Sequence, residues 1–169
     1  ATGKQGSVWI PLSEKLNVSG KTIVLATFGV GGTRVDQWLD SNYLLPFYKE
    51  NLANLKQVYP KPNAAVWIQG ESDKSTPQEK FTSNLIAWLD IVSADLSTTD
   101  IYLTGTSYCD GSENQQVVEA QKRLINKYNG IFVGSTDVLK DVKYRYDDCH
   151  FSEQGIKKLA ELISDSWIK

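Results

Sequence analysis

The sequence predicts an α/β protein in which helices cover both faces of a parallel sheet. Two observations lead to this prediction. Short apolar runs alternate with longer segments of helical periodicity, and no repeat, low-complexity tract or linker interrupts the alternation. Such alternation is typical of parallel sheets, because a parallel neighbour is reached only through a crossover connection. A chain of 169 residues suits one domain, so residues 1–169 are expected to form a single domain.

Four apolar runs rich in β-branched or aromatic residues are the expected strands, and the first of them, TIVLATF, is expected to be buried. The runs cover residues 22–28, 64–68, 101–106 and 131–134. Helical periodicity marks residues 7–16, 44–58, 77–96, 113–128 and 152–168. Thr76 and Ser152 are placed to cap the third and fifth of these helices, and Gly130 follows the end of the fourth.

Composition argues against several kinds of partner. The net charge is −2 and no Lys/Arg run exists, so we expect no nucleic-acid partner. The apolar runs are too short to span a bilayer, so no membrane partner is expected either. One histidine and two cysteines do not make the usual zinc set, and the sequence implies no metal and no organic cofactor.

The cysteines, Cys109 and Cys149, each lie in a polar, turn-like stretch after an apolar run. They are either two free thiols or a disulfide that ties two loops together. We favour the disulfide, which would suit a secreted or surface-associated protein. Closing a loop of this length could stabilise the fold by about 3–4 kcal/mol in the chain-entropy model.

The loops that follow the strands are where function is expected, because chemistry in parallel sheets gathers at the carboxyl ends of the strands. The first loop, FGVGGTR, is either a flexible turn or a place where a backbone amide faces a developing oxyanion. Its spacing fits neither GxGxxG nor GxxxxGKS/T, which argues against a phosphate site. In the second loop, QGESD, Gln69 could donate to an oxyanion, and Glu71 could be a structural acid or a substrate contact.

The last loop contains the only histidine of the chain, His150, three residues after Asp147. A turn between them lets the carboxylate accept the Nδ1–H of the imidazole, which fixes the tautomer and stabilises an imidazolium. The alternative is a histidine at a helix end beside two surface acids. The polar character of the other two loops favours the catalytic interpretation.

These blocks resemble the SGNH (GDSL-like) hydrolases, most closely their carbohydrate esterases and sialate O-acetylesterase-like proteins. Gly31-Gly32-Thr33 with Trp38 resembles their GGT…W segment. Residues 67–73, WIQGESD, resemble their W-x-Q-G-E-S-D block, and residues 147–152, DDCHFS, resemble their final D-x-x-H block. The likeness runs over nearly the whole chain. It implies a three-layer α/β/α fold with a flavodoxin-like sheet, and a serine esterase that removes acyl groups, typically acetyl, from carbohydrate.

The resemblance also implies roles for individual residues. His150 would be the catalytic base and Asp147 its orienting acid, while Gly32 and Gln69 would form the oxyanion hole. Further positions would bind the substrate or support the site: Gly31, Thr33 and Glu71. The substrate would be an acylated carbohydrate.

One departure from the family concerns the nucleophile, which in the family lies in a GDS or GQSN block directly after the first strand. No such block precedes Ser7. A parallel sheet without this inner strand leaves ladder groups unpaired. We therefore expect this chain to be the C-terminal part of a longer protein, with strand and serine in a segment upstream of Ala1 or in another chain. Ser72 is the alternative nucleophile, but it would leave the glycine loop without a role.

Two other functions stay open at this point. The chain could be a carbohydrate-binding or structural module without a nucleophile, in which Trp38, Tyr43 and Tyr108 stack on sugar rings. It could also be a lipase-like or thioesterase enzyme, which a long apolar acyl groove would mark.

Overall fold

The sheet of this computed structural model, which describes residues 5–17, 22–96 and 100–167, has three parallel strands. Strand β1 (Ala64–Trp67) pairs with β2 (Asp100–Gly105), which pairs with β3 (Ile131–Ser135), in the order β1-β2-β3. Val66 lies beside Tyr102, and Tyr102 lies beside Ile131. A helix connects each strand to the next, as a parallel sheet requires. The predicted α/β fold with a parallel sheet is confirmed.

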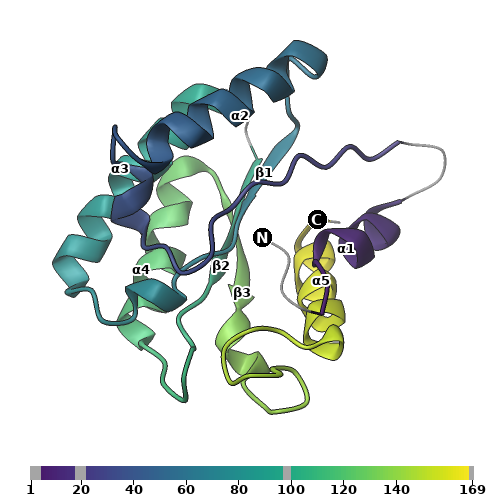
Figure 1. The fold of residues 1–169 in the computed structure, drawn as a ribbon, viewed down its shortest axis with the longest axis vertical. Coiled ribbons are helices and arrows are strands. Elements are labelled where there is room, and N and C mark those ends of the chain that lie inside the picture. Colours follow the sequence, from purple (N-terminus) through teal and green to yellow (C-terminus); the bar gives the residue numbers. More distant parts are fainter. Residues whose placement is uncertain (1–4, 18–21, 97–99, 168–169) are drawn as a thin grey trace.

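Helices lie on both sides of the sheet (Figure 1). On one side are α2 (Leu44–Val58), α3 (Gln78–Leu96) and α4 (Gln115–Ile125). On the other side are α1 (Trp9–Leu16) and α5 (Glu153–Trp167). All lie where the apolar periodicity predicts them, although the last residue of the fifth predicted helix, 168, lies outside the described residues. In the described part of the chain, no helix has both the length and the apolarity that a bilayer crossing requires.

Three tryptophans form the centre of the core between the sheet and α2–α4. The ring centroids of Trp67 and Trp88 lie 5.0 Å apart, and those of Trp38 and Trp67 lie 5.4 Å apart. Phe81 and Leu85 of α3 are fully buried beneath them. The indole N–H of Trp38 donates to Thr33 Oγ1 at 3.1 Å, so this core also holds the loop that contains the glycines.

Helix α5 packs on the opposite face of the sheet and so positions the last loop, which directly precedes it. Trp167 stacks on Tyr102 with centroids 4.3 Å apart, and Ile163 is completely buried in the same cluster. At the other end of the helix, Ser152 Oγ accepts the N–H of Gly155 at 3.2 Å, which is the predicted cap. The helix therefore begins directly after the loop that contains His150.

Residues 22–28 are not a strand, and this prediction was wrong. The segment is irregular, and most of its side chains are exposed. Within the described residues, the only hydrogen bond to the backbone of residues 22–30 comes from Thr33 Oγ1, which donates to the carbonyl oxygen of Val30. The sequence TIVLATF has high β propensity, but a strand also needs a neighbour for its N–H and C=O groups. Among the residues that the structure describes, no strand pairs with this segment.

Candidate active site

A cavity of about 830 Å³ opens at the carboxyl edge of the sheet, where the loops after the strands meet. The structure brings the residues predicted from all three loops to this one cavity. Its wall includes Gly31, Gly32, Thr33, Gln69, Glu71, Ser72, Cys109, Asp147, Cys149 and His150. The side chains and backbone at this edge can therefore act together on one bound group.

Asp147 and His150 form a hydrogen-bonded pair within the last loop. His150 Nδ1 lies 2.9 Å from Asp147 Oδ2, and Asp147 Oδ1 accepts the backbone N–H of His150 at 2.7 Å. An ionised carboxylate only accepts, so Nδ1 carries the proton and Nε2 is left free to accept another. The imidazole is 60% exposed, which leaves it accessible from the cavity.

The charge of Asp147 is stabilised by its neighbours. Partial burial by itself would raise the pKa of this carboxyl, but hydrogen bonds from the backbone and ring of His150 and from the N–H of Cys149 lower the pKa below its ordinary value. Asp147 is therefore ionised at neutral pH. A charged carboxylate against Nδ1 holds one tautomer of the ring and favours its protonated form during a reaction.

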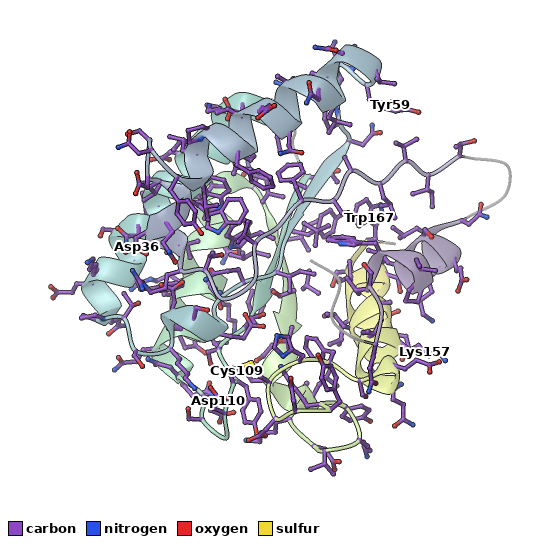
Figure 2. All side chains as sticks on the ribbon, in the orientation of Figure 1. Asp36, Tyr59, Cys109, Asp110, Lys157 and Trp167 are labelled. Carbon is purple, nitrogen blue, oxygen red and sulfur yellow. A yellow bond between two sulfur atoms is a disulfide. The ribbon has the colours of Figure 1, made fainter. Side chains whose placement is uncertain are left out.

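A disulfide joins Cys109 to Cys149, so the favoured pairing of the two cysteines is present in the structure. It links the loop after β2 to the residue directly before His150. Figure 2 labels Cys109 and Asp110 at this junction. Beside the disulfide, the backbone N–H of Asp110 donates to the carbonyl oxygen of Asp148 at 3.0 Å.

The glycine loop presents open backbone to the cavity. Gly32 has φ +71°, a conformation that favours glycine. Apart from the adjacent residues, no atom of the described part of the chain lies within 4 Å of where a Cβ on Gly31 or Gly32 would stand. Thr33 is buried, and its Oγ1 donates to the carbonyl oxygen of Val30 at 2.8 Å, which closes the turn. The loop is therefore folded at Thr33 and accessible at its glycines, as an oxyanion site built from backbone amides requires.

The side chain of Gln69 connects two loops and has no free N–H. Its Nε2 donates to the carbonyl oxygen of Thr33 at 3.0 Å and to Asp73 Oδ2 at 2.6 Å, so both amide protons have protein acceptors. Its Oε1 is buried and has no hydrogen-bond partner among the described residues. An oxyanion role for Gln69 stays a prediction, and it would require the release of one of these two bonds.

Glu71 and Ser72 lie on a short 3₁₀ turn, Glu71–Asp73, that forms part of the cavity wall. Burial raises the pKa of Glu71 above its ordinary value. Hydrogen bonds from its own backbone and from that of Gly70, and the nearby charge of Arg145, only partly oppose this rise. No hydrogen bond joins Ser72 to His150 in the part of the chain that the structure describes. The structure therefore gives no contact in support of Ser72 as the nucleophile.

Two buried charged residues that sequence reasoning missed hold these loops. Arg145 is 2% exposed and donates to the carbonyl oxygens of Leu139, Thr136 and Cys149, with its guanidinium 4.0 Å from the ring centroid of Phe151. Asp137 accepts the N–H and the Oγ–H of Ser107 at 2.9 and 2.6 Å. Neither residue stands in a motif, so the sequence held no signal for them.

The aromatic side chains considered as a sugar platform do not form one at the cavity. Trp38 and Tyr108 are 3% and 8% exposed, so their rings present no open face. Tyr43 is half-exposed but does not line the cavity. For Trp38 and Tyr108 this prediction of the carbohydrate-binding alternative was wrong, because Trp38 packs in the core and Tyr108 packs against Arg145.

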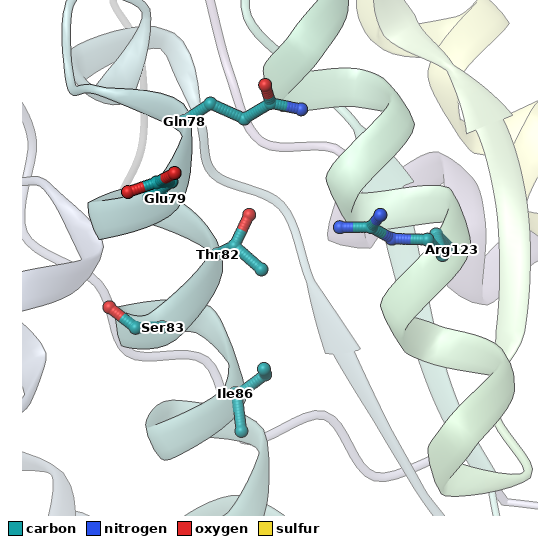
Figure 3. Close-up of a pocket in the computed structure, with 6 residues that line it drawn as sticks. All are labelled: Gln78, Glu79, Thr82, Ser83, Ile86 and Arg123. Atoms are coloured by element: carbon teal, nitrogen blue, oxygen red, sulfur yellow. The ribbon is translucent and has the colours of Figure 1, made fainter.

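A second, shallower hollow lies between α3 and α4, where Arg123 of α4 extends toward Thr82 of α3 (Figure 3). None of the predicted site residues lines it. In the ranges that the structure describes, no group of His, Cys, Asp and Glu side chains could hold a metal ion.

A parallel α/β fold with an aspartate–histidine pair at its carboxyl edge fits an SGNH-type hydrolase. The chain belongs to the family of carbohydrate esterases described as sialic acid-specific acetylesterases, whose family model matches residues 11–169. Membership in this family supports an esterase-type function. No curated protein matches the chain in sequence.

Two solved structures share the fold. One, described as a GDSL-like lipase from Parabacteroides merdae ATCC 43184, has a TM-score of 0.64 at 18% identity and is matched over 82% of this chain and 70% of its own. The other, a peptidoglycan O-acetylesterase, has a TM-score of 0.63 at 16% identity, over 83% of this chain and 44% of its own. This chain thus spans less than half of the acetylesterase. At these identities the likeness concerns the fold.

Proposed function

We propose that the protein is a serine esterase that removes acetyl groups from carbohydrate by a Ser-His-Asp mechanism, with the serine in a segment upstream of Ala1. The observation on which this depends is the 2.9 Å contact between Asp147 Oδ2 and His150 Nδ1 at the wall of a cavity shared with the glycine loop. Family membership supports the reaction class and an acylated carbohydrate as substrate.

The proposed reaction uses the free nitrogen of His150. Nε2 takes the proton of the serine hydroxyl as the serine oxygen attacks the ester carbonyl, and Asp147 stabilises the imidazolium that forms. The backbone amide of Gly32 would donate to the tetrahedral oxyanion. His150 then gives its proton to the departing sugar hydroxyl. Water attacks the acyl-enzyme with the same help from His150 and releases acetate.

The free edge of β1 supports the placement of the serine. Within the described residues β1 pairs with β2 alone, so its other edge has no ladder partner. Beside that edge the cavity is lined by apolar side chains: Val8, Trp9, Phe28, Val66, Ile68 and Leu159. A strand added parallel to β1 would cover these side chains and give residues 22–28 the neighbour they lack. Its carboxyl end would lie at the edge where Asp147 and His150 stand.

Labelling the nucleophile tests this proposal. The product of the natural gene, including any upstream residues, is treated with a fluorophosphonate and digested, and the labelled peptide is identified by mass spectrometry. We expect one labelled serine N-terminal to Ala1, and no labelling after His150→Ala, because the hydroxyl then has no base. Labelling of Ser72, or a natural product that begins at Ala1 and still hydrolyses acetyl esters, would refute the upstream serine.

The preferred length of the acyl chain distinguishes an acetylesterase from the lipase-like alternative. Acetyl and octanoyl p-nitrophenyl esters are compared, and we expect kcat/KM to favour acetyl. A preference for octanoyl would favour the lipase-like alternative. Binding of a glycan without turnover by the natural gene product would favour the nucleophile-free module.

We also propose that the protein is secreted or surface-associated, because its disulfide would persist in an oxidising compartment.

A further inference from the structure

We infer that the Cys109–Cys149 disulfide is a positioning element for His150, and that its reduction displaces the imidazole while the fold persists. This inference rests on the proposed function only for its effect on catalysis. The position of the ring itself can be measured without turnover.

The contacts made by His150 itself lie within the last loop, whereas the contacts that tie this loop to the rest of the protein are made by other residues. Those with Asp147 are internal to the last loop, because they join residues three positions apart, and they would move with the loop. The contact of the His150 and Tyr146 rings, with centroids 5.9 Å apart, is internal as well. The ring is 60% exposed, so packing against the body of the protein contributes little. Contacts elsewhere in the loop must therefore place His150 relative to the cavity.

Links between the loop and the rest of the molecule cluster at the two residues before His150. Cys149 carries the disulfide, and its carbonyl oxygen accepts Arg145 Nη1. Asp148 accepts the N–H of Asp110 at its carbonyl oxygen and the hydroxyl of Tyr108 at its carboxylate. Of these links only the disulfide is covalent, and it is attached directly next to His150.

The other end of the disulfide is anchored in rigid structure. Cys109 and Ser112 exchange backbone hydrogen bonds of 3.0 and 3.2 Å, which close a tight turn. Lys74 Nζ donates to the carbonyl oxygen of Cys109. Just upstream, where the chain leaves β2, Ser107 is completely buried and donates its N–H and Oγ–H to Asp137. The disulfide thus fixes the exposed His150 relative to the buried strand β2.

Cys109 and Cys149 are half-buried and line the cavity, so we expect a small thiol to reach their disulfide. A dithiol such as dithiothreitol supplies two electrons and two protons, becomes a cyclic disulfide, and leaves Cys109 and Cys149 as thiols. Arg145 and Asp148 still retain the loop, so we expect a local displacement. A displacement of about 1 Å in a catalytic group can lower kcat by about 100-fold, whereas substrate affinity changes less.

The single histidine makes the test direct. The protein is labelled with ¹³C,¹⁵N-histidine, and the ring-proton shifts and the nuclear Overhauser contacts of the ring to protons outside the last loop are recorded before and after dithiothreitol. We expect both to change on reduction and to recover on reoxidation, with unchanged far-UV circular dichroism. The nitrogen shifts should report protonated Nδ1 in both states, because Asp147 moves with the ring. The Cys109→Ser/Cys149→Ser variant should resemble the reduced protein and show no response to dithiothreitol.

Two results would overturn the inference. One is unchanged ring-proton shifts and contacts after complete reduction, and the other is global unfolding on reduction, which would make the disulfide a general staple. Kinetics of the full-length protein then separate the two proposals. Loss of kcat by about tenfold or more with little change in KM supports both. A change in the shifts in a full-length protein that never hydrolyses esters would leave the positioning intact and refute the esterase.

Discussion

The Oδ2 atom of Asp73 accepts the backbone N–H of Val35 at 2.8 Å, across 38 positions of the chain. The same oxygen accepts Gln69 Nε2 at 2.6 Å, and Asp73 is completely buried. One carboxylate thus joins the glycine loop to the loop after β1. The open glycines can present their amides to the cavity because Asp73 holds the residues that follow them.

Replacing Asp73 by alanine should lower the free energy of unfolding by about 3 kcal/mol, because a buried N–H left without an acceptor costs about 1–3 kcal/mol. Urea unfolding measures this as a lower midpoint at an unchanged slope. The matched control is Asp36→Ala, whose carboxylate pairs with Arg34 at the surface and should cost less than about 1 kcal/mol. Equal losses in the two variants would contradict the bridging role of Asp73.

Gly70 of the QGESD block should tolerate no side chain. A Cβ there would stand 1.8 Å from the carbonyl oxygen of Thr106, and its φ of +153° is one that other residues rarely adopt. Gly70→Ala should therefore lose about 3 kcal/mol or more of stability. Gly31→Ala, which adds its methyl to open space, should change stability by less than about 0.5 kcal/mol. Thermal unfolding compares them, and a stable Gly70→Ala protein would refute the geometry.

Asp147→Asn should lower kcat by about 10³–10⁴-fold in the full-length enzyme, because an amide can donate to Nδ1 and so favours the wrong tautomer of His150. Stability should change by less than about 1 kcal/mol, because both side chains are largely exposed. Hydrolysis of p-nitrophenyl acetate measures the effect, with Asp165→Asn on the exposed side of α5 as control. Retention of more than a tenth of the wild-type rate would remove Asp147 from the mechanism.

The pH dependence of stability should reveal Glu71. Burial raises its folded-state pKa above the ordinary value of 4.5, so its neutral form stabilises the fold below that value and this contribution is lost as pH rises through the folded pKa. Glu71→Gln keeps a neutral group at every pH. The stability of the variant relative to wild type should therefore rise between about pH 4 and about pH 8. Urea unfolding at both values, with exposed Glu50→Gln as reference, tests the sign. A falling difference would contradict it.

Local pattern predicted most of the helices and strands. The apolar spacing of residues 44–58 coincides with the bounds of α2, and the predicted cap at Ser152 is present, because both depend on residues a few positions apart. The helix predicted for residues 113–128 is shorter than expected: α4 ends at Ile125, and a 3₁₀ turn leads to Asn129 at φ +51°. A tightened last turn is common at helix ends and leaves no distinct pattern in the sequence.

The failures concern partners that lie far away in the chain. Residues 22–28 have the composition of a strand, yet whether they form one depends on a neighbour that composition does not encode. The three loops were expected to meet because their strands are parallel, and they do. How they are held together was not predictable. Asp137 binds the backbone of Ser107, 30 positions away, and Arg145 binds three carbonyl oxygens within its own loop region. Any polar loop contains residues of these types, so their type gives no signal.

The tryptophan cluster has an optical consequence. Trp38, Trp67 and Trp88 lie with ring centroids 5.0–5.7 Å apart at angles of 48–87°, close enough for their excited states to couple. The circular dichroism of the aromatic bands should therefore include a contribution from this trio. The α2–α4 layer thus carries its own spectroscopic reporter, and loosening of the glycine loop, whose Thr33 binds Trp38, would be visible there without any added dye.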